Sequence, residues 1–152
     1  MAKRIILFLV LNFGALAIGS LFTSAGVSSD WYSNLNKAPW TPPGWVFGAA
    51  WTSIMICYAV YMAKLSSLKE IQKQVIALYS LQWLLNALWN PSFFYFREVE
   101  IGLFIILSLT LVVAVFFFKY LKALKLYTLL LLPYLLWLII ASSLNAYIFL
   151  YN

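Results

Sequence analysis

Five long runs of residues without Asp, Glu, Lys or Arg restrict the fold of this chain more than any other feature. The runs are residues 5–29, 38–63, 74–96, 101–118 and 126–152. Each is close in length to the ~20 residues that an α-helix needs to cross a lipid bilayer. Only 9% of the residues are charged and 65% are hydrophobic, whereas a soluble domain has about 25% charged residues. The sequence predicts a polytopic membrane protein and excludes a soluble enzyme, a disordered chain or a disulfide scaffold.

The apolar runs favour helices over the strands of a membrane β-barrel. Residues 103–118 and 129–140 are apolar on every side, whereas barrel strands alternate apolar and polar residues. A helix also satisfies every backbone amide inside hydrocarbon. We therefore expect an all-α membrane protein, a five-transmembrane-helix bundle that forms one domain over residues 1–152. The expected helices cover about residues 5–26, 44–63, 74–96, 100–119 and 126–150, and residues 27–43 form a lid-like loop.

Basic residues are unequally divided between the two ends of such a bundle. The first end has eight basic residues and one acidic residue, namely Lys3, Arg4, Lys64, Lys69, Lys73, Lys119, Lys122, Lys125 and Glu70. The second end has two basic and three acidic residues, namely Lys37, Arg97, Asp30, Glu98 and Glu100. Because basic loops stay in the cytoplasm, we expect a cytoplasmic N-terminus, with the 27–43 loop and the C-terminus on the opposite face. The net charge of +6 then reflects topology and requires no nucleic-acid partner.

Several kinds of chemistry are excluded by residues that the sequence lacks. There is no histidine, which removes a Ser-His-Asp site, a His-ligated zinc and a His-ligated haem. The single cysteine, Cys57, is expected to be a small packing residue. None of the five charge-free runs places an Asp, Glu, Lys or Arg inside the membrane, which argues against a proton-coupled pump. We expect no metal site and no cofactor.

Uncharged polar side chains are the main polar groups within the predicted membrane spans. Gln82, Asn86 and Asn90 are four residues apart, so their carboxamides share one face of the third helix. An unpaired amide is costly in lipid, so this face must point into the bundle. The last helix carries a similar face, formed by Tyr134, Trp137, Ala141 and Asn145. Two interpretations stay open: the amides link helices, or they line a ligand cavity.

Small residues form stripes on the first two helices. One stripe is Ala15, Gly19 and Thr23, and the other is Gly44, Gly48 and Thr52. Small residues at this spacing let two helix backbones approach closely. We therefore expect both stripes to be helix-packing faces.

The 27–43 segment is rich in aromatic residues and proline. Trp31, Tyr32 and Trp40 lie in it, and Pro42 and Pro43 lead the chain into the second helix. Prolines restrict the backbone and cannot continue a helix. The aromatic residues could form a belt at the membrane interface, or the segment could be a shaped lid over the helix ends.

Three groups of residues are specific enough to indicate a family. The first is Trp31-Tyr32, Trp40-Thr41-Pro42-Pro43-Gly44-Trp45-Val46-Phe47-Gly48 and Trp51. The second is Leu85-Asn86 with Trp89, Phe93 and Phe94, and the third is Pro133-Tyr134 with Trp137, Ala141, Leu144-Asn145 and Asn152. Together they resemble the TspO/translocator protein family, also called the peripheral benzodiazepine receptor or TspO/MBR family, over nearly the whole chain. Two positions depart from the family pattern: Lys37-Ala38 replaces a basic residue followed by proline, and Ile54-Met55 replaces Leu-Tyr.

The resemblance implies a bacterial member, located in the cell membrane and forming a homodimer. It implies a membrane receptor or transport-like protein that binds porphyrins such as protoporphyrin IX, or other apolar ligands, in an intramembrane cavity. Such a protein would serve tetrapyrrole homeostasis or an oxidative-stress response. The residues expected to line the cavity are Trp31, Tyr32, Pro42, Trp51, Asn86, Asn90, Phe93, Trp137 and Ala141.

Two alternative functions remain open. Some bacterial members of the family are reported to degrade protoporphyrin IX in light and oxygen, and the resemblance would assign that chemistry to Trp51 and Trp137. An excited porphyrin could oxidise a stacked indole without any acid–base group. The second alternative is a structural or assembly protein, in which the amides serve only to hold the bundle together.

Overall fold

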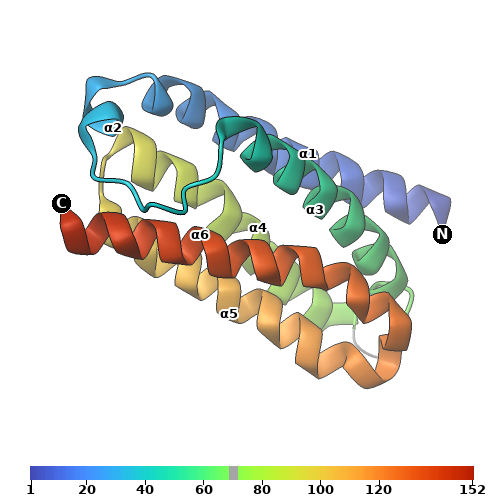
Figure 1. Cartoon of the computed structure of the whole chain (residues 1–152). Coiled ribbons are helices and arrows are strands. Elements are labelled where there is room, and N and C mark those ends of the chain that lie inside the picture. Colours follow the sequence, from blue (N-terminus) through green and yellow to red (C-terminus); the bar gives the residue numbers. More distant parts are fainter. Residues whose placement is uncertain (69–71) are drawn as a thin grey trace.

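The structure is a computed structural model that describes residues 1–68 and 72–152. Within those residues five long helices alternate in direction, so the N-terminus and the C-terminus lie at opposite ends (Figure 1). The long helices are α1 (Ala2–Val27), α3 (Gly44–Leu65), α4 (Gln72–Asn90), α5 (Val99–Leu124) and α6 (Leu132–Tyr151). The short segments between them are α2 (Asp30–Asn34), η2 (Pro91–Tyr95) and η3 (Lys125–Leu131). The expected all-α five-helix bundle is confirmed.

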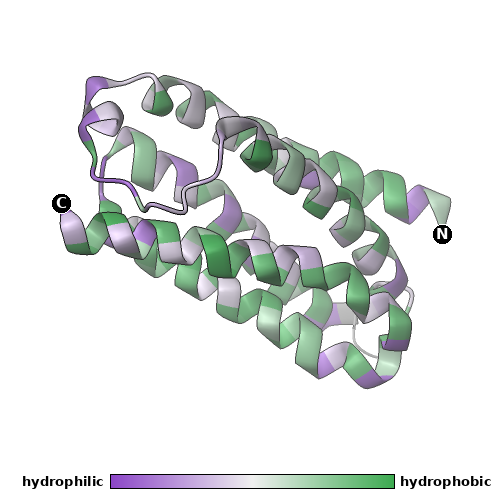
Figure 2. Ribbon diagram, viewed as in Figure 1, coloured by the Kyte–Doolittle hydropathy of each residue, from purple (hydrophilic) through white to green (hydrophobic). Residues whose placement is uncertain are grey.

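The outside of the bundle suits a membrane. Within the described residues, three helical stretches are long and apolar enough to cross one: Ala2–Val27, Gly44–Leu65 and Val99–Tyr151. The third stretch is 53 residues long because it contains α5, η3 and α6. Figure 2 shows hydrophobic residues along all the long helices, and many large apolar side chains are exposed. With a mean hydropathy of +0.94, the chain is an integral membrane protein.

The long helices pack as a closed ring around an aromatic core. α1 packs against α3 and α4, α5 packs against α4 and α6, and α3 meets α6. The ring of Tyr58 is central, with its centroid 5.4 Å from that of Tyr134, 5.9 Å from that of Tyr79 and 6.1 Å from that of Phe116. These rings come from the halves of the helices nearest the N-terminus of the chain. The main core therefore fills that end, and the 27–43 segment between α1 and α3 lies at the other.

Two prolines mark breaks within the spans expected over residues 74–96 and 126–150, and the sequence already predicts that Pro91 kinks or ends its helix. α4 ends at Asn90, and Pro91 opens a π-helical turn in which the amide of Phe96 donates to the carbonyl of Pro91 at 3.0 Å. Pro133 is the second residue of α6, and residues 125–131 form a 3₁₀-helix instead of the expected first turns of an α-helix from residue 126. Proline lacks an N–H group and crowds the carbonyl four residues earlier, so an α-helix begins at proline more easily than it passes through.

The segment expected to be a lid-like loop over residues 27–43 begins with a short helix, α2. The amide of Tyr32 donates to the hydroxyl of Ser29 at 3.3 Å, and this hydroxyl donates to the carbonyl of Gly26 at 2.6 Å. The serine therefore caps the new helix while holding it to the end of α1. This local hydrogen bonding gives the segment more regular structure than its prolines indicate.

Basic side chains gather at the end of the bundle that holds the N-terminus. This end also contains the α3–α4 and α5–α6 connections, whereas the α1–α3 loop and the C-terminus lie at the opposite end (Figure 1). The structure therefore confirms that the segments expected to share one end of the bundle do so. Lys69 and Glu70, which that count includes, lie outside the described residues.

The two small-residue stripes have different outcomes. On α1, a Cβ atom placed on Gly19 would lie 3.1 Å from Cγ of Asn90, so the stripe is a packing face as expected. On α3, a Cβ on Gly44 or Gly48 would meet no atom within 4 Å, and Thr52 is exposed. The expectation of helix packing was wrong for this second stripe, because the spacing defines a face but not the direction in which the fold turns it.

Candidate functional site

A small pocket lies beneath the α1–α3 loop, at the opposite end of the bundle from the main core. Its volume is about 50 Å³. Its walls come from α2 and the following loop, from α3, from α4 with η2, and from α6. The lining residues are Tyr32, Lys37, Thr41, Phe47, Trp89, Phe93, Phe94, Ala141, Leu144, Asn145 and Ile148. Among the residues predicted to bind ligand, the pocket therefore brings together Tyr32, Phe93 and Ala141.

Aromatic rings form one continuous wall of this pocket. The rings of Trp89 and Phe93 are stacked with their centroids 5.4 Å apart. The ring of Trp31 meets that of Phe93 edge-on at 5.7 Å, and the ring of Tyr32 lies 5.6 Å from that of Phe94. The π-turn that starts at Pro91 directs Phe93 and Phe94 inward, where both are buried. The wall therefore joins the predicted residue Trp31 to the pocket, although Trp31 does not line it directly.

Polar groups stand at the loop side of the pocket. The ammonium group of Lys37 donates to the carbonyl of Tyr32 at 2.7 Å and lies 4.6 Å from the centre of the Tyr32 ring. Burial raises the pKa of the Tyr32 hydroxyl above its ordinary value. Tyr32 therefore stays protonated at neutral pH, so a cation and a hydroxyl donor occupy the same edge.

Trp51 and Trp137 lie at the junction of α3 and α6, next to the pocket. Trp137 packs edge-on against Phe47 at 5.2 Å between ring centroids, and Trp51 packs against Tyr134 at 6.0 Å. Trp137 is only 6% exposed, and its buried indole nitrogen has no hydrogen-bond partner among the described residues. Phe47 lines the pocket, as does Ala141, one helical turn beyond Trp137. Both predicted tryptophans thus point into the bundle; the photochemical role considered for them stays a prediction.

The three carboxamides of α4 separate to different partners. Gln82 donates to the hydroxyl of Tyr134 on α6 at 2.7 Å, whereas Asn90 accepts from the hydroxyl of Thr23 on α1 at 2.6 Å. Both therefore link helices, and neither lines the pocket. Asn86 is 7% exposed, and its side chain makes no hydrogen bond within residues 1–68 and 72–152. The inward direction expected for this face is confirmed for Gln82 and Asn86.

Side chains at the pocket that were not among the predicted ligand residues include Phe47, Trp89 and Asn145. Asn145 accepts from the indole nitrogen of Trp89 at 3.1 Å and donates to the carbonyl of Val99 at 3.0 Å. The spacing of Asn145 from Ala141 already placed it on the inward face of its helix. Pro42, which was predicted to bind ligand, is half-buried in the loop and does not line the pocket.

The C-terminal residue holds the loop over the pocket. The side-chain oxygen of Asn152 accepts from the amide of Asn36 at 2.7 Å, and its side-chain nitrogen donates to the carbonyl of Asn36 at 3.2 Å. Farther along the loop, the indole of Trp40 donates to the hydroxyl of Ser143 at 3.1 Å. The loop is therefore fastened to α6 at two points, and we name the Asn36–Asn152 pair the loop latch.

Replacing Asn152 with alanine should free the loop from α6. We expect hydrogen exchange at the Asn36 amide to become about fivefold to tenfold faster, since a net hydrogen bond contributes about 1 kcal/mol. Amide exchange followed by mass spectrometry in detergent measures this rate. Asn34→Ala is the matched control, because Asn34 is exposed at the end of α2. Equal exchange in wild type and Asn152→Ala would show that the latch does not hold the loop.

Comparison with known proteins places the whole chain in one group. The sequence model of the TspO/MBR family matches residues 5–151. The chain is 37% identical over 139 residues to the tryptophan-rich protein TspO of Archaeoglobus fulgidus, covering 88% of this chain and 87% of that one. It is 34% identical over 116 residues to the tryptophan-rich sensory protein of Cereibacter sphaeroides, covering 76% and 73% of the two chains. It is 32% identical over 132 residues to the human translocator protein, covering 84% and 78%. A match of this extent, on a five-helix membrane bundle, shows that the chain belongs to the TspO/MBR family.

Proposed function

We propose that this protein is a membrane receptor or transport-like protein that binds porphyrins, with protoporphyrin IX as the representative ligand. The observation that carries the proposal is the composition of the pocket beneath the loop. Stacked aromatic rings form its wall, and Lys37 with Tyr32 stands at one edge. A porphyrin is a flat apolar ring with carboxylates on one side, so the pocket offers a matching face and a matching edge.

The contacts expected of a porphyrin follow from this arrangement. Aromatic faces bind a flat conjugated ring through offset stacking and burial of apolar area. The ammonium group of Lys37 and the protonated hydroxyl of Tyr32 can each donate to a carboxylate. Lys37 now donates to three backbone carbonyls, those of Tyr32, Ser33 and Leu35. A ligand carboxylate would take over this cation, because a charged acceptor binds it more strongly than a neutral carbonyl does.

The pocket must enlarge before it can admit a porphyrin. Its volume of about 50 Å³ is far below the ~300–1,000 Å³ typical of small-molecule sites. The loop is the element that can move, since it is fastened to α6 chiefly through the loop latch and the Trp40–Ser143 bond. In our proposal the structure is the closed state, and the ligand enters when the loop separates from α6.

A titration with protoporphyrin IX in detergent or nanodiscs tests the proposal through quenching of tryptophan fluorescence. We expect saturable binding that Trp137→Phe weakens about threefold to tenfold, because the smaller ring loosens the edge-on contact with Phe47 and an aromatic pair is worth about 0.5–1.5 kcal/mol. Trp137 supports the pocket through Phe47 and is buried. Binding measured by porphyrin absorbance gives a second readout that does not depend on the number of tryptophans.

Trp45→Phe is the matched control for this titration. Trp45 is the second residue of α3. Unlike Trp137, it is 74% exposed and does not line the pocket. We expect its replacement to leave porphyrin affinity unchanged. Absence of saturable binding in the wild type would refute the proposal, and equal losses in both variants would show that the porphyrin binds elsewhere on the membrane surface of the protein.

A further inference from the structure

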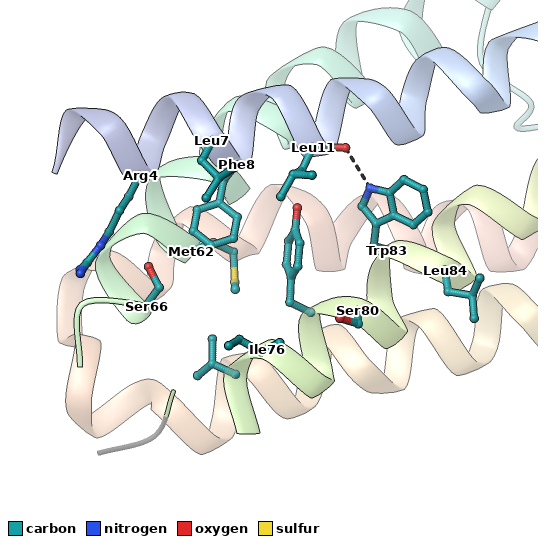
Figure 3. Close-up of a pocket in the computed structure, with 12 residues that line it drawn as sticks. Arg4, Leu7, Phe8, Leu11, Met62, Ser66, Ile76, Ser80, Trp83 and Leu84 are labelled. Carbon is teal, nitrogen blue, oxygen red and sulfur yellow. Dashed lines mark hydrogen bonds between the residues drawn. The ribbon is translucent and has the colours of Figure 1, made fainter. Parts of the chain in front are cut away.

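A second and much larger pocket lies at the other end of the bundle, between α1 and α4. Its volume is about 790 Å³, within the ~300–1,000 Å³ range of ligand sites. Figure 3 shows side chains from α1, α3 and α4 around it. The lining residues are Arg4, Leu7, Phe8, Leu11, Met62, Ser66, Val75, Ile76, Tyr79, Ser80, Trp83 and Leu84. We name this pocket the α1–α4 groove; it shares no lining residue with the pocket beneath the loop.

The groove opens toward the surroundings of the bundle. Leu7 is 53% exposed, Ile76 is 61% exposed and Leu84 is 49% exposed. All three stand on helices whose outer faces are apolar, so in a bilayer the opening faces lipid chains.

The floor of the groove is held in place by packing and hydrogen bonds. The rings of Phe8 and Tyr79 meet edge-on with their centroids 5.1 Å apart. The hydroxyl of Tyr79 donates to the side chain of Asn12 at 2.7 Å. Figure 3 shows the second bond, in which the indole of Trp83 donates to the carbonyl of Leu11 at 2.9 Å. These bonds join α1 to α4 along the groove. The shape of the groove is therefore fixed by contacts between α1 and α4.

A positive charge stands at one end of this apolar groove. Arg4 extends from the first turn of α1 beside Ser66, at the end of the groove nearest the N-terminus (Figure 3). Lys64 and Lys73 lie at the same end of the bundle, close to the two ends of the α3–α4 connection. The groove thus has a cationic end followed by an apolar channel. An anionic lipid is complementary to it, because it has a negative headgroup followed by apolar chains.

We propose that the α1–α4 groove binds one anionic phospholipid of the surrounding membrane. Its phosphate lies against Arg4, and one acyl chain follows the groove past Leu7 and Leu11 toward Trp83. With a rise of 1.5 Å per residue, Arg4 and Leu11 lie about 10 Å apart along α1, so the groove takes the upper part of an acyl chain. Basic pockets between membrane helices are suited to anionic headgroups.

A lipid fits this groove better than a second copy of the chain. In a symmetric dimer across this surface, each subunit would present Arg4 and the neighbouring basic end to the same region of its partner. Like charges would then approach one another, which is unfavourable. An anionic lipid instead neutralises the arginine and covers the exposed apolar walls in one step.

The binding of phosphatidylglycerol tests the proposal. We would measure retention of dioleoyl phosphatidylglycerol, against dioleoyl phosphatidylcholine, on the purified full-length protein by native mass spectrometry. We expect Arg4→Gln to lower phosphatidylglycerol affinity about fivefold and to leave phosphatidylcholine unaffected. Lys3→Gln is the matched control, because Lys3 is the preceding residue and does not line the groove. Equal losses from the two variants would mean that the basic end attracts anionic lipid diffusely, and the proposal would fail.

A second variant tests the acyl-chain part of the site. Ser80 lines the groove and is exposed, so Ser80→Phe should fill the channel and remove the retained lipid even with Arg4 in place. Ser53→Phe is its control, because Ser53 is exposed on α3 and does not line the groove. Unchanged lipid retention in Ser80→Phe would overturn the proposal, as would displacement of the lipid by protoporphyrin IX. Porphyrin affinity should be the same in Arg4→Gln and wild type, so the outcome is separate from that for the proposed function.

Discussion

Gly26→Ala is expected to destabilise the bundle by about 1–3 kcal/mol, the usual cost of adding a methyl group to a well-packed site. Gly26 is buried near the end of α1. A Cβ atom there would lie 2.5 Å from Cβ and 2.7 Å from Cγ of Phe94. These atoms are next to the backbone of η2, so rotation of the ring cannot relieve the clash. Unfolding by heat or by a denaturing detergent, with wild type in parallel, measures the loss.

Gly14→Ala is the matched control, because a Cβ at Gly14 would have no atom within 4 Å. Both glycines lie on α1, and the gain in helix propensity of about 0.5–1 kcal/mol applies to the interior position Gly14, whereas Gly26 is the second-last residue of the helix and gains less. We expect Gly14→Ala to be neutral or slightly stabilising. Gly26→Ala should also weaken porphyrin binding, since Phe94 lines the pocket beneath the loop. Similar stability of the two variants would show that α1 and η2 are not in close contact.

Asn145→Ala is expected to lower the free energy of unfolding by about 1–3 kcal/mol. Asn145 is 2% exposed and bonds to both Trp89 and the Val99 carbonyl. Alanine would leave the partly buried indole N–H of Trp89 and the partly buried carbonyl of Val99 without their partner. In a membrane bundle one lost hydrogen bond can cost less than in a soluble core. Asn145→Ala removes two bonds at once, so its effect on the free energy of unfolding should be large enough to measure. Thermal unfolding in detergent provides the measurement.

A double-mutant cycle separates the Asn145–Trp89 bond from other effects of the substitution. In a Trp89→Phe background the indole donor is already gone, so Asn145→Ala should cost less than in wild type. Ser53→Ala controls for removal of a polar side chain from a membrane helix, because Ser53 is exposed on α3 and, within residues 1–68 and 72–152, its hydroxyl bonds only to the Ala49 carbonyl. Equal costs in the two backgrounds would show that Asn145 and Trp89 are not coupled.

The carboxamide face of α4 shows how far a sequence pattern extends. The four-residue spacing of Gln82, Asn86 and Asn90 correctly predicts that polar groups turn inward. It cannot predict that Gln82 bonds to α6, that Asn90 bonds to α1 and that Asn86 makes no hydrogen bond with the described residues. The partner of each amide depends on which helices are neighbours, and that depends on the closed ring of helices rather than on α4.

The candidate site shows the same limit. The residue pattern singled out Tyr32, Phe93 and Ala141, and the fold brings these three to one pocket. The pattern also suggested Asn90, which the fold uses to join α1 and α4 through Thr23. The loop latch depends on contact between residues 36 and 152, a separation that no local pattern can reveal.

The existence of five helices and their division into two charged ends could be read from the chain, because both follow from local physics. A run of apolar residues long enough to span hydrocarbon must satisfy its own backbone hydrogen bonds, and this makes it a helix whatever its neighbours are. Which faces meet is a different matter. The stripes on α1 and α3 have the same small-residue spacing, yet one packs on Asn90 and the other faces outward. Side-chain packing between segments distant in sequence selects between such faces, so the pocket, the loop latch and the α1–α4 groove became visible only in three dimensions.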